Sequence, residues 1–522
     1  MTTAREPPYL LGIDIGTTNL KANLYDVAGR RVAAASRPTM AEHPHARNPD
    51  WAEYSPESLW QATAANIREV VGQVADAGQI KALAVVGMGE PIIPVDRRGD
   101  WLYPAICWFD RRTEPQAQWW RDQFGARRVY GITGQPVSFF LSLNAMLWLR
   151  EHEPELFRRA HRWLVVEDYV MFKLASVYAT DYSIASRTMG FDVQRKCWSE
   201  ELFAAAGLDP GSMAVPHPSG TAVGSVTETA SAITGLAAGT VVATGGHDHG
   251  CTSLPANVLG PDSVLNSTGT ADVMLGVLPE ARLSDAAHDA AIPVYPHPLA
   301  DRYQVMDCIL FGATALDWYL ERFGSDVRTH AARTGSNAYD LLLAGAEQAE
   351  ARSRGLIWIP NARGTPTDPA VRGAFLGVRD SHTASDFVRA ILEGICYEVR
   401  ARIDEFERLF GANVQRVVAV GGAARSPFWS QLRADITGRT VEVLDTEEAA
   451  SLGGAMLAGI AAGIYANHDT AVRQVYRVQR RFTPDPVRRE QYDDCFRRVY
   501  GRCSAALRGV DAELAAIFPP ES

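Results

Sequence analysis

The sequence predicts an α/β protein made of two similarly folded domains that face each other across a cleft. Its 522 residues exceed what one hydrophobic core usually organises, so two domains are expected. A pattern of apolar strand, Gly-Thr turn and second strand begins near residue 9 and again near residue 262, and helical sequence follows each copy. Two copies of one supersecondary unit in a single chain favour two domains of the same kind.

The first copy contains three predicted strands, a helix and a buried strand, in that order. The stretch YLLGIDIGTTNLKANLYDVAGRRVAAASR, residues 9–37, indicates strands separated by turns at Gly16 and at Ala28-Gly29. The stretch SPESLWQATAANIREVVGQV predicts a helix with Ser55 as its N-cap and Pro56 at its first position. The apolar stretch IKALAVVGMGE predicts the strand that follows.

The second copy, DSVLNSTGTADVMLGV, covers residues 262–277 and precedes a long helical region. We place the domain boundary between Pro255 and Pro261. This predicts a first domain over 1–257, a second over 258–466 and a charged, helical C-terminal extension over 467–522. The uncharged apolar window from Leu452 to Tyr465 is shorter than the ~18 residues of a membrane span, and it predicts a buried helix.

Charge and cysteine content favour small-molecule chemistry over other functions. A formal net charge of -10 gives no basic surface for nucleic acid or an anionic membrane. The N-terminal MTTAREPPYL lacks the apolar segment of a signal peptide. The seven cysteines are scattered and never in CxxC spacing, which indicates reduced thiols and a cytoplasmic location.

The motif GIDIGTTNLK has the features of a phosphate-binding turn. Asp14 ends an apolar strand and could hold a hydrated Mg²⁺, while a glycine turn lets the backbone approach a polyphosphate. The residues expected to contact nucleotide are Gly16, Thr17, Thr18 and Lys21 here, and Thr268, Gly269 and Thr270 in the similar NSTGTAD of the second copy. A plain hairpin with a Thr-rich turn is the alternative, and the second copy makes it less favoured.

Other phosphate motifs are missing, so the nucleotide clamp is expected to be hairpin-based. No GxxxxGK[ST] occurs, and no GxGxxG opens a helix after the first strand. In RVVAVGGAARSPFW a strand leads into Gly421, Gly422 and Ala423, which leave room for an adenine ring, and Ser426 is predicted to cap the next helix. Simple close packing of strand and helix is the alternative interpretation of the two glycines.

An ordered set of motifs resembles the FGGY carbohydrate kinases, which belong to the superfamily of actin, hexokinase and the chaperone ATPases. The set comprises GIDIGTTNLK, DWAEYSPESLW, AICWFDRRT, GGHDHG, NSTGTAD, GAFLGV, ILEGICYEVR, GGAARSPFWSQLRADITG and EEAASLGGAMLAG. The resemblance runs from Leu10 to Tyr465 and implies two ribonuclease H-like domains flanking a cleft. It also implies ATP and Mg²⁺ as cofactors, the sugar on the first domain and ATP mostly on the second, with Gly312 among the nucleotide-binding residues.

The resemblance makes Asp248, in VVATGGHDHGCTSL, the catalytic base. Transfer of a phosphoryl group to a sugar hydroxyl needs a carboxylate that accepts the hydroxyl proton. Asp14 and Asp248 are then the expected metal ligands. His247 and His249 would share one face of a strand, as zinc-binding HxH pairs do, but no third ligand is evident nearby. The two histidines are expected to contact the sugar or to support residues that do.

The sugar pocket is expected in the first domain. The resemblance places Met88, Gly89 and Glu90 at the substrate hydroxyls, and Trp108 can cover the apolar side of a carbohydrate. The alternative for Trp108 is a core tryptophan. Asp110 is a further expected sugar contact, although it can instead form a local salt bridge with Arg112. Arg187, in SIASRTMGFD, lies in a family-like segment, and a structural role is expected for it.

Two departures from the family pattern shape the substrate prediction. Glycerol kinases have an Arg-Glu pair where this chain has Gly89-Glu90, so a gap is expected at Gly89. Some relatives hold the adenine with an Asn where this chain has Ser426, which is closer to the ketopentose kinases.

The predicted function is ATP-dependent phosphorylation of a ketopentose such as xylulose or ribulose at its terminal hydroxyl. The alternatives are a kinase for erythritol, glycerol or another polyol, a chaperone-like ATPase, or a silent sensor that binds sugar or nucleotide. The expected partner is a small-molecule sugar, with neither nucleic acid nor membrane, and a homodimer is left open.

Overall fold

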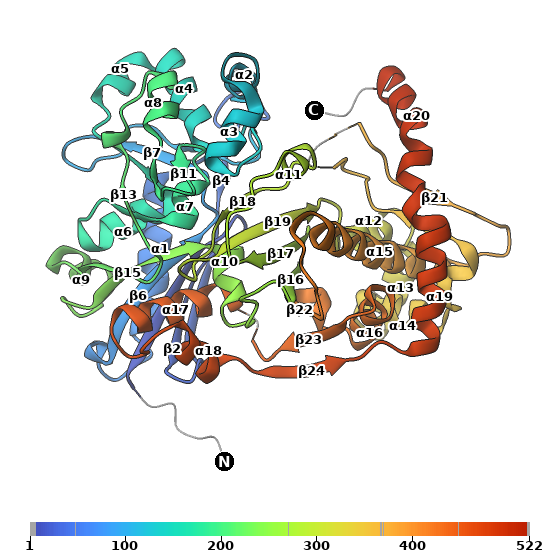
Figure 1. Cartoon of the computed structure of the whole chain (residues 1–522). Helices are drawn as coiled ribbons and strands as arrows, with labels where there is room; N and C mark the ends of the chain where they lie inside the picture. Colours follow the sequence, from blue (N-terminus) through green and yellow to red (C-terminus); the bar gives the residue numbers. More distant parts are fainter. Residues whose placement is uncertain are drawn as a thin grey trace. The chain divides into compact units, whose positions relative to one another are not determined.

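The chain divides into two units, and it passes between them more than once. The computed structural model describes residues 7–46, 48–269, 271–365, 368, 370–446 and 448–518. Unit 1 comprises Met1–Leu259, Val277–Val305 and Glu448–Tyr476, and unit 2 comprises Gly260–Gly276, Met306–Glu447 and Arg477–Ser522. Both units combine strands and helices (Figure 1). Thr270, which was predicted to bind nucleotide, lies outside the described residues.

The central sheet of unit 1 contains six strands in the order β14-β15-β6-β1-β2-β3. Their bounds are β1 Tyr9–Ile15, β2 Asn19–Asp26, β3 Arg31–Pro38, β6 Ile80–Gly87, β14 Ala222–Ser225 and β15 Val241–His247. The predicted strands and the helix after them are confirmed, because α1 covers Pro56–Val71 and the Ser55 side chain accepts a hydrogen bond from the Ser58 N–H. Strand β1 pairs antiparallel with β2 and parallel with β6, and β15 pairs parallel with β6.

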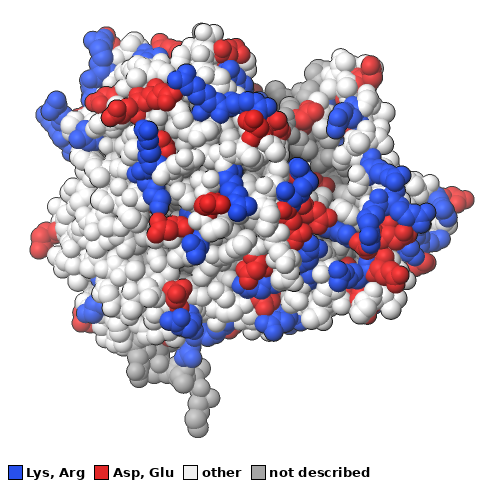
Figure 2. Space-filling model, viewed as in Figure 1, with Lys and Arg blue, Asp and Glu red and all other residues white. Residues whose placement is uncertain are grey.

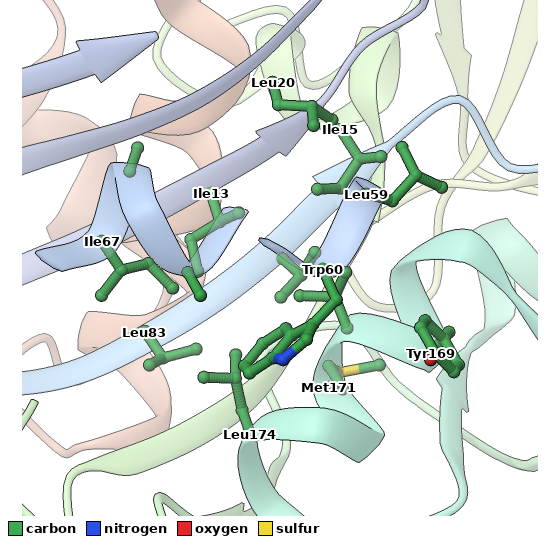
Figure 3. Close-up of a cluster of buried hydrophobic side chains, with 14 of the residues drawn as sticks. Ile13, Ile15, Leu20, Leu59, Trp60, Ile67, Leu83, Tyr169, Met171 and Leu174 are labelled. Atoms are coloured by element: carbon green, nitrogen blue, oxygen red, sulfur yellow. The ribbon is translucent and has the colours of Figure 1, made fainter. Parts of the chain in front are cut away.

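A hydrophobic core lies between this sheet and the helices α1 and α6 (Val166–Ala175). Figure 3 shows Trp60 of α1 beside Leu174 and Met171 of α6, with Ile13 and Leu83 of the sheet nearby. Alternate residues of a strand point to opposite faces, so β1 contributes Ile13 and Ile15 to this core and Leu10 to a second one on the other face. Because both faces of the sheet are packed, the ends of its strands have fixed positions.

Helix α17 (Ala449–Ala461) packs on the other face of the same sheet. Its buried face confirms the helix predicted over the apolar window. A side chain at Gly12 of β1 would collide with the Ser451 carbonyl oxygen, so the helix lies directly against the strand. The predicted second domain, 258–466, includes this segment, and that boundary stays a prediction. By its packing, Glu448–Tyr476 groups with unit 1, because the apolar face of α17 lies against the sheet of that unit.

The remaining elements of unit 1 surround the sheet. The strands are β4 Ala41–Glu42, β5 Glu53–Tyr54, β7 Ile92–Val95, β8 Ala105–Ile106, β9 Arg162–Val165, β10 Ala179–Asp181, β11 Phe191–Asp192, β12 Cys197–Trp198, β13 Val215–His217 and β18 Val294–Pro296. The helices are α2 Glu114–Trp119, α3 Ala126–Thr133, α4 Ser142–His152, α5 Pro154–Arg159, α7 Tyr182–Ser186, α8 Glu200–Ala206, α9 Glu228–Thr234, α10 Asp248–Ser253, α11 Asp285–Asp289 and α18 His468–Val475.

Unit 2 repeats the strand pairing of unit 1. Its strands β16 (Ser263–Thr268) and β17 (Asp272–Leu278) form an antiparallel hairpin, as predicted. Strand β22 (Arg416–Val420) pairs parallel with β16, and β23 (Thr440–Leu444) pairs parallel with β22. The hairpin, the parallel third strand and the parallel fourth strand therefore occur twice in the chain.

Helices and short strands complete unit 2. They are β19 Tyr303–Ile309, which runs from unit 1 into unit 2, β20 Ile357–Ile359, β21 Ala374–Leu376, α12 Thr314–Arg322, α13 Ser325–Thr334, α14 Ala338–Gln348, α15 Ala384–Phe410, α16 Pro427–Thr437, α19 Pro486–Cys495 and α20 Gly501–Ile517. The C-terminal extension was predicted to be helical throughout. It also contains β24 (Val478–Phe482), which pairs with β23 through its backbone, while Arg481 forms an ion pair with Glu442.

The surface carries both signs of charge. On the face shown in Figure 2, Lys and Arg side chains are interspersed with Asp and Glu. Across the part of the chain that the structure describes, no helix has the length and apolar character needed to cross a membrane.

Candidate active site

Asp248 begins helix α10 directly after the last residue of β15. Its Oδ1 atom accepts a hydrogen bond of 2.5 Å from the His249 N–H and lies 3.2 Å from the His247 Nδ1 atom. Burial alone would raise the pKa of Asp248, but His249, His247 and the His249 N–H together hold it below its ordinary value. The carboxylate is therefore ionised at neutral pH, which is the form that can accept a proton.

The two histidines beside Asp248 differ in their surroundings. His247 is buried, and burial lowers its pKa to about 3, so its ring is neutral. The ring centroids of His247 and His249 lie 5.8 Å apart.

Within the described ranges, no cluster of three or more His, Cys, Asp or Glu side chains is arranged to hold a metal ion.

Asp14, the acid of the first phosphate turn, is buried near the end of β1. Burial and the negative charge of Asp248 raise the pKa of Asp14 to about 7, while Lys21 opposes them. Two carboxylates that repel each other form a donor set that suits a hydrated Mg²⁺, which prefers oxygen ligands and keeps several waters. Lys21, predicted to reach phosphate, donates a hydrogen bond of 2.7 Å to Glu448.

The first Gly-Thr turn presents its hydroxyls to solvent. Thr17 and Thr18 are exposed, and the Gly16 N–H donates to the Asn19 carbonyl at 3.2 Å, which closes the turn. Trp108 donates from Nε1 to the Thr17 hydroxyl at 3.1 Å. The Trp108 side chain is 39% exposed, so it is not the core tryptophan that the sequence left as an alternative.

A buried ion pair lies just beyond the end of β6. Arg187 donates from Nε to Glu90 Oε1 at 2.6 Å and from Nη1 to Gln135 Oε1 at 3.2 Å. The Arg187 guanidinium lies 5.3 Å from the ring centroid of Tyr295 and 5.6 Å from that of Phe140. Glu90 therefore presents an acceptor beside a fixed set of donors and aromatic surfaces, as a polyol site requires.

The expected gap at Gly89 is absent, and that prediction is wrong. Gly89 has a φ of +87°, and a Cβ there would lie 3.1 Å from Cγ of Arg187 and 3.2 Å from Cδ2 of His247. The Arg187 side chain thus occupies the space beside Gly89. The sequence did not indicate the contact between Glu90 and Arg187, because no local spacing links positions 90 and 187. Met88, also predicted to contact sugar, is buried in this segment.

Both carboxylate oxygens of Asp110 accept hydrogen bonds from the protein itself. Its Oδ2 atom accepts hydrogen bonds from the Ala52 N–H at 2.7 Å and from Arg112 Nη2 at 2.6 Å, and its Oδ1 atom accepts one from the Arg112 N–H. Arg112 also donates to Glu53 at 2.7 Å. This closed arrangement favours the local salt bridge that the sequence left as the alternative to a sugar contact.

Unit 2 contains a pocket of about 830 Å³, within the usual size range of small-molecule sites. Several residues that the sequence assigned to nucleotide line it, namely Thr268, Gly269, Gly422, Ala423 and Ser426. Other lining residues come from helices α12, α14 and α16, namely Leu316, Asp317, Tyr339, Asp340, Leu343, Phe428 and Trp429. The sequence gave no motif for those of α12 and α14. Ser426 caps α16 as predicted and accepts a hydrogen bond from the Trp429 N–H.

Two glycines assigned to nucleotide have packing roles instead of lining the pocket. Gly421 has a φ of +91°, and a side chain there would collide with the Thr268 carbonyl oxygen. A Cβ at Gly312 would lie 2.7 Å from the Asp272 nitrogen. A Cβ added at Gly422, in contrast, would have no neighbouring heavy atom within 4 Å. Close packing therefore accounts for Gly421, while Gly422 leaves open space at the pocket.

The duplicated strand pattern, the ionised aspartate and the pocket beside a Gly-Thr hairpin define a phosphotransferase of the actin/hexokinase type. Residues 9–254 match the N-terminal domain model of the FGGY family of carbohydrate kinases, and residues 264–462 match its C-terminal domain model. The chain belongs to the FGGY family of carbohydrate kinases, and it has the mixed α/β, two-domain fold of that family. Members of this family transfer phosphate from ATP to a carbohydrate.

Individual relatives resemble the chain over nearly its whole length. It is 30% identical to a xylulose kinase of Bacillus subtilis (strain 168) over 94% of this chain and 96% of that protein. It is 29% identical to an autoinducer-2 kinase of Klebsiella pneumoniae over 93% of this chain and 92% of that protein. Among solved structures, xylulose kinase from Rhodospirillum rubrum matches with a TM-score of 0.86 and 27% identity, covering 97% of this chain and all of that one.

Proposed function

We propose that this chain phosphorylates the terminal hydroxyl of a ketopentose, with xylulose or ribulose as its substrate and with ATP and Mg²⁺. The observation that carries the proposal is the Glu90–Arg187 pair in the same unit as the ionised Asp248. The relatives named xylulose kinase, which match almost the whole chain, support the ketopentose assignment.

Asp248 acts as the general base. Its carboxylate accepts the proton of the sugar hydroxyl as the oxygen attacks phosphorus, and the His249 N–H keeps it oriented. The buried ring of His247 places its Nδ1 atom 3.2 Å from the same carboxylate oxygen, Oδ1. Mg²⁺ held by Asp14 and Asp248 would neutralise charge on the transferred phosphate. Thr17 and Thr18 are proposed to donate to phosphate oxygens.

The sugar is recognised by fixed polar groups flanked by aromatic rings. Glu90 accepts and Arg187 donates hydrogen bonds to neighbouring sugar hydroxyls. Gln135 adds a donor, since its Nε2 atom is buried and has no hydrogen-bond partner within the part of the chain the structure covers. Trp108, Met88 and His249 are proposed to border the sugar. A substrate that lacks these hydroxyls would leave buried polar groups unpaired, which is strongly unfavourable.

ATP is proposed to bind in the pocket of unit 2. The base would lie against Gly422 and Ala423, and the phosphates would approach the Thr268-Gly269 turn. The free thiols of all seven cysteines and the use of ATP support a cytoplasmic location. A homodimer remains a proposal that size-exclusion chromatography with light scattering would test.

A substrate panel in a coupled ADP-release assay tests the function. We expect kcat/KM for xylulose or ribulose to exceed that for glycerol, erythritol and fuculose at least tenfold. A preference for glycerol over every longer substrate would refute the ketopentose assignment. ATP binding without turnover on any sugar or polyol would favour the silent sensor, and sugar-independent ATP hydrolysis would favour the chaperone-like ATPase.

A further inference from the structure

A fully buried arginine lies behind the Gly-Thr hairpin of unit 2. The Arg433 side chain, from helix α16, has no exposed surface. Its Nη2 atom donates to the Thr268 hydroxyl at 3.0 Å and lies 3.7 Å from Asp272 Oδ2. Its Nε and Nη1 atoms have no hydrogen-bond partner among the described residues. Burying a guanidinium with so few partners is costly, so a stability role alone accounts poorly for its presence.

The partners of Arg433 are the two residues that close the hairpin. Thr268 ends β16, Asp272 begins β17, and the two face each other in the strand register. Within the turn, the Gly269 N–H donates to the Ala271 carbonyl at 2.9 Å. The Asn266 amide also donates to Asp272. Arg433 therefore contacts the first residue of the turn, Thr268, without itself lining the pocket that Thr268 and Gly269 border.

Helix α16 also forms part of the pocket. Ser426, Phe428 and Trp429, in its cap and first turn, are lining residues, and the Arg433 guanidinium lies 5.7 Å from the Trp429 ring centroid. Arg433 lies one turn further along the helix than Trp429. The Arg433 side chain thus links helix α16, beside the proposed adenine position, to the Thr268-Gly269 turn, where the phosphates are proposed to bind.

We propose that Arg433 is a positioning residue that fixes the phosphate turn relative to helix α16, so that one nucleotide finds its base and phosphate contacts preorganised. The inference rests on the proposed assignment of ATP to this pocket. Preorganisation acts on affinity by reducing the ordering that binding requires. Loss of Arg433 should therefore raise the Kd and KM for ATP, with a smaller effect on kcat and none on the KM for sugar.

The test compares variants of the full-length protein. Removing one partner of a buried ion pair leaves the other charge buried and unpaired. The main variant is therefore the double change Arg433→Met with Asp272→Asn. Arg433→Lys is the conservative variant. We expect the double variant to raise the calorimetric Kd for ATP at least tenfold and Arg433→Lys to raise it less. Arg400→Met, which removes a mostly buried arginine paired with Asp493, should lower Tm without changing the ATP Kd.

Thr268 provides a second route to the same result if the double variant fails to fold. Thr268→Val removes the hydroxyl that accepts the hydrogen bond from Arg433, and it should bind ATP as weakly as the double variant. An ATP Kd within twofold of wild type in Thr268→Val, or in a folded double variant, would overturn the proposal. Wild-type protein that binds no ATP would instead refute the proposed function.

Discussion

The two copies of the strand pattern place different chemistry at equivalent strand ends. In unit 1 the acid, Asp14, precedes the Gly-Thr turn, and the threonines of that turn are exposed. In unit 2 the acid, Asp272, follows the turn, and Thr268 is fully buried and held by Arg433. One turn is therefore open toward a ligand, while the other is fixed from behind.

The third strand of each copy ends in the same backbone bend. Gly89 follows β6 with a φ of +87°, and Gly421 follows β22 with a φ of +91°. The next residue is the carboxylate Glu90 in unit 1 and the open Gly422 in unit 2. We call this glycine and the residue after it the platform of each unit, and we expect the platform of unit 1 to bind hydroxyls and that of unit 2 to bind a flat ring.

The fourth strands allow the sharpest test of this comparison. Asp248 follows β15, and the exposed Asp445 follows β23 at the equivalent point. Asp248→Asn should lower kcat at least ~10²-fold with nearly unchanged ATP affinity, because removing a general base affects the chemical step. Asp445→Asn should keep full activity. Single changes of His247 or His249 to Ala should cost less than Asp248→Asn. Residual turnover above about a tenth of wild type would refute the role of Asp248.

The platform of unit 1 should control sugar use alone. Glu90→Gln and Arg187→Met should each raise the sugar KM about 10- to 100-fold, because a buried polar partner is left unpaired, while the ATP Kd stays unchanged. Arg112→Met removes a buried arginine paired with Asp110 and should reduce Tm without this selective effect. Equal damage to sugar and ATP binding by Glu90→Gln would place Glu90 outside the sugar site.

The platform of unit 2 should show the opposite selectivity. Gly422→Val should weaken ATP binding about tenfold or more at near-normal Tm, because no protein atom lies near its Cβ position and the proposed site of the base is there. Gly421→Ala should lower Tm first, because its side chain would collide with the Thr268 backbone. Unchanged ATP affinity in Gly422→Val would mean that the base lies elsewhere in the pocket.

The smallest expected effect is on the pH dependence of stability, and it involves Glu167, which contacts Gly89 of the unit 1 platform. Burial raises the pKa of Glu167 from 4.5 to about 8, and its Oε1 atom accepts a hydrogen bond from the Gly89 N–H at 3.1 Å. Between pH 4.5 and about 8, Glu167 is deprotonated in the unfolded chain but still protonated in the folded protein. The contribution of Glu167 to stability therefore falls as pH rises from 4.5 toward 8.

Glu167→Gln mimics the protonated acid and should remove this dependence. We expect its Tm to exceed that of the wild type by about 2 to 4 °C at pH 8.5 and to equal it near pH 5. Thermal denaturation across this pH range measures the difference. An equal Tm offset at both pH values would show that Glu167 titrates normally.

Local patterns predicted most of the fold and picked out several residues that line the pocket of unit 2. The strand hairpins, the Ser55 and Ser426 caps and the buried helix α17 follow from spacing and composition within short windows. Strand β24 was missed, because VQRRF carries two arginines and pairs through its backbone.

Contacts between residues far apart in the sequence are the features that local patterns could not predict. The Glu90–Arg187 pair joins residues 97 positions apart, and nothing local to either residue signals the other. The assignment of residues 448–476 to unit 1 likewise depends on packing against strands from the start of the chain. One partner of Asp110, the Ala52 N–H, lies on another segment, so the spacing of Asp110 to Arg112 alone could not decide between a salt bridge and a sugar contact.

The late position of α17 has a consequence for biosynthesis. The helix that covers Gly12 of β1 begins at Ala449, so the ribosome makes it long after the strand it covers. During most of translation one apolar face of the first sheet lacks its covering helix, and the nascent chain depends on delayed closure or on chaperones. A gene fragment that ends near residue 260 should therefore yield an aggregation-prone product, and supplying residues 448–476 on a second fragment should improve its solubility.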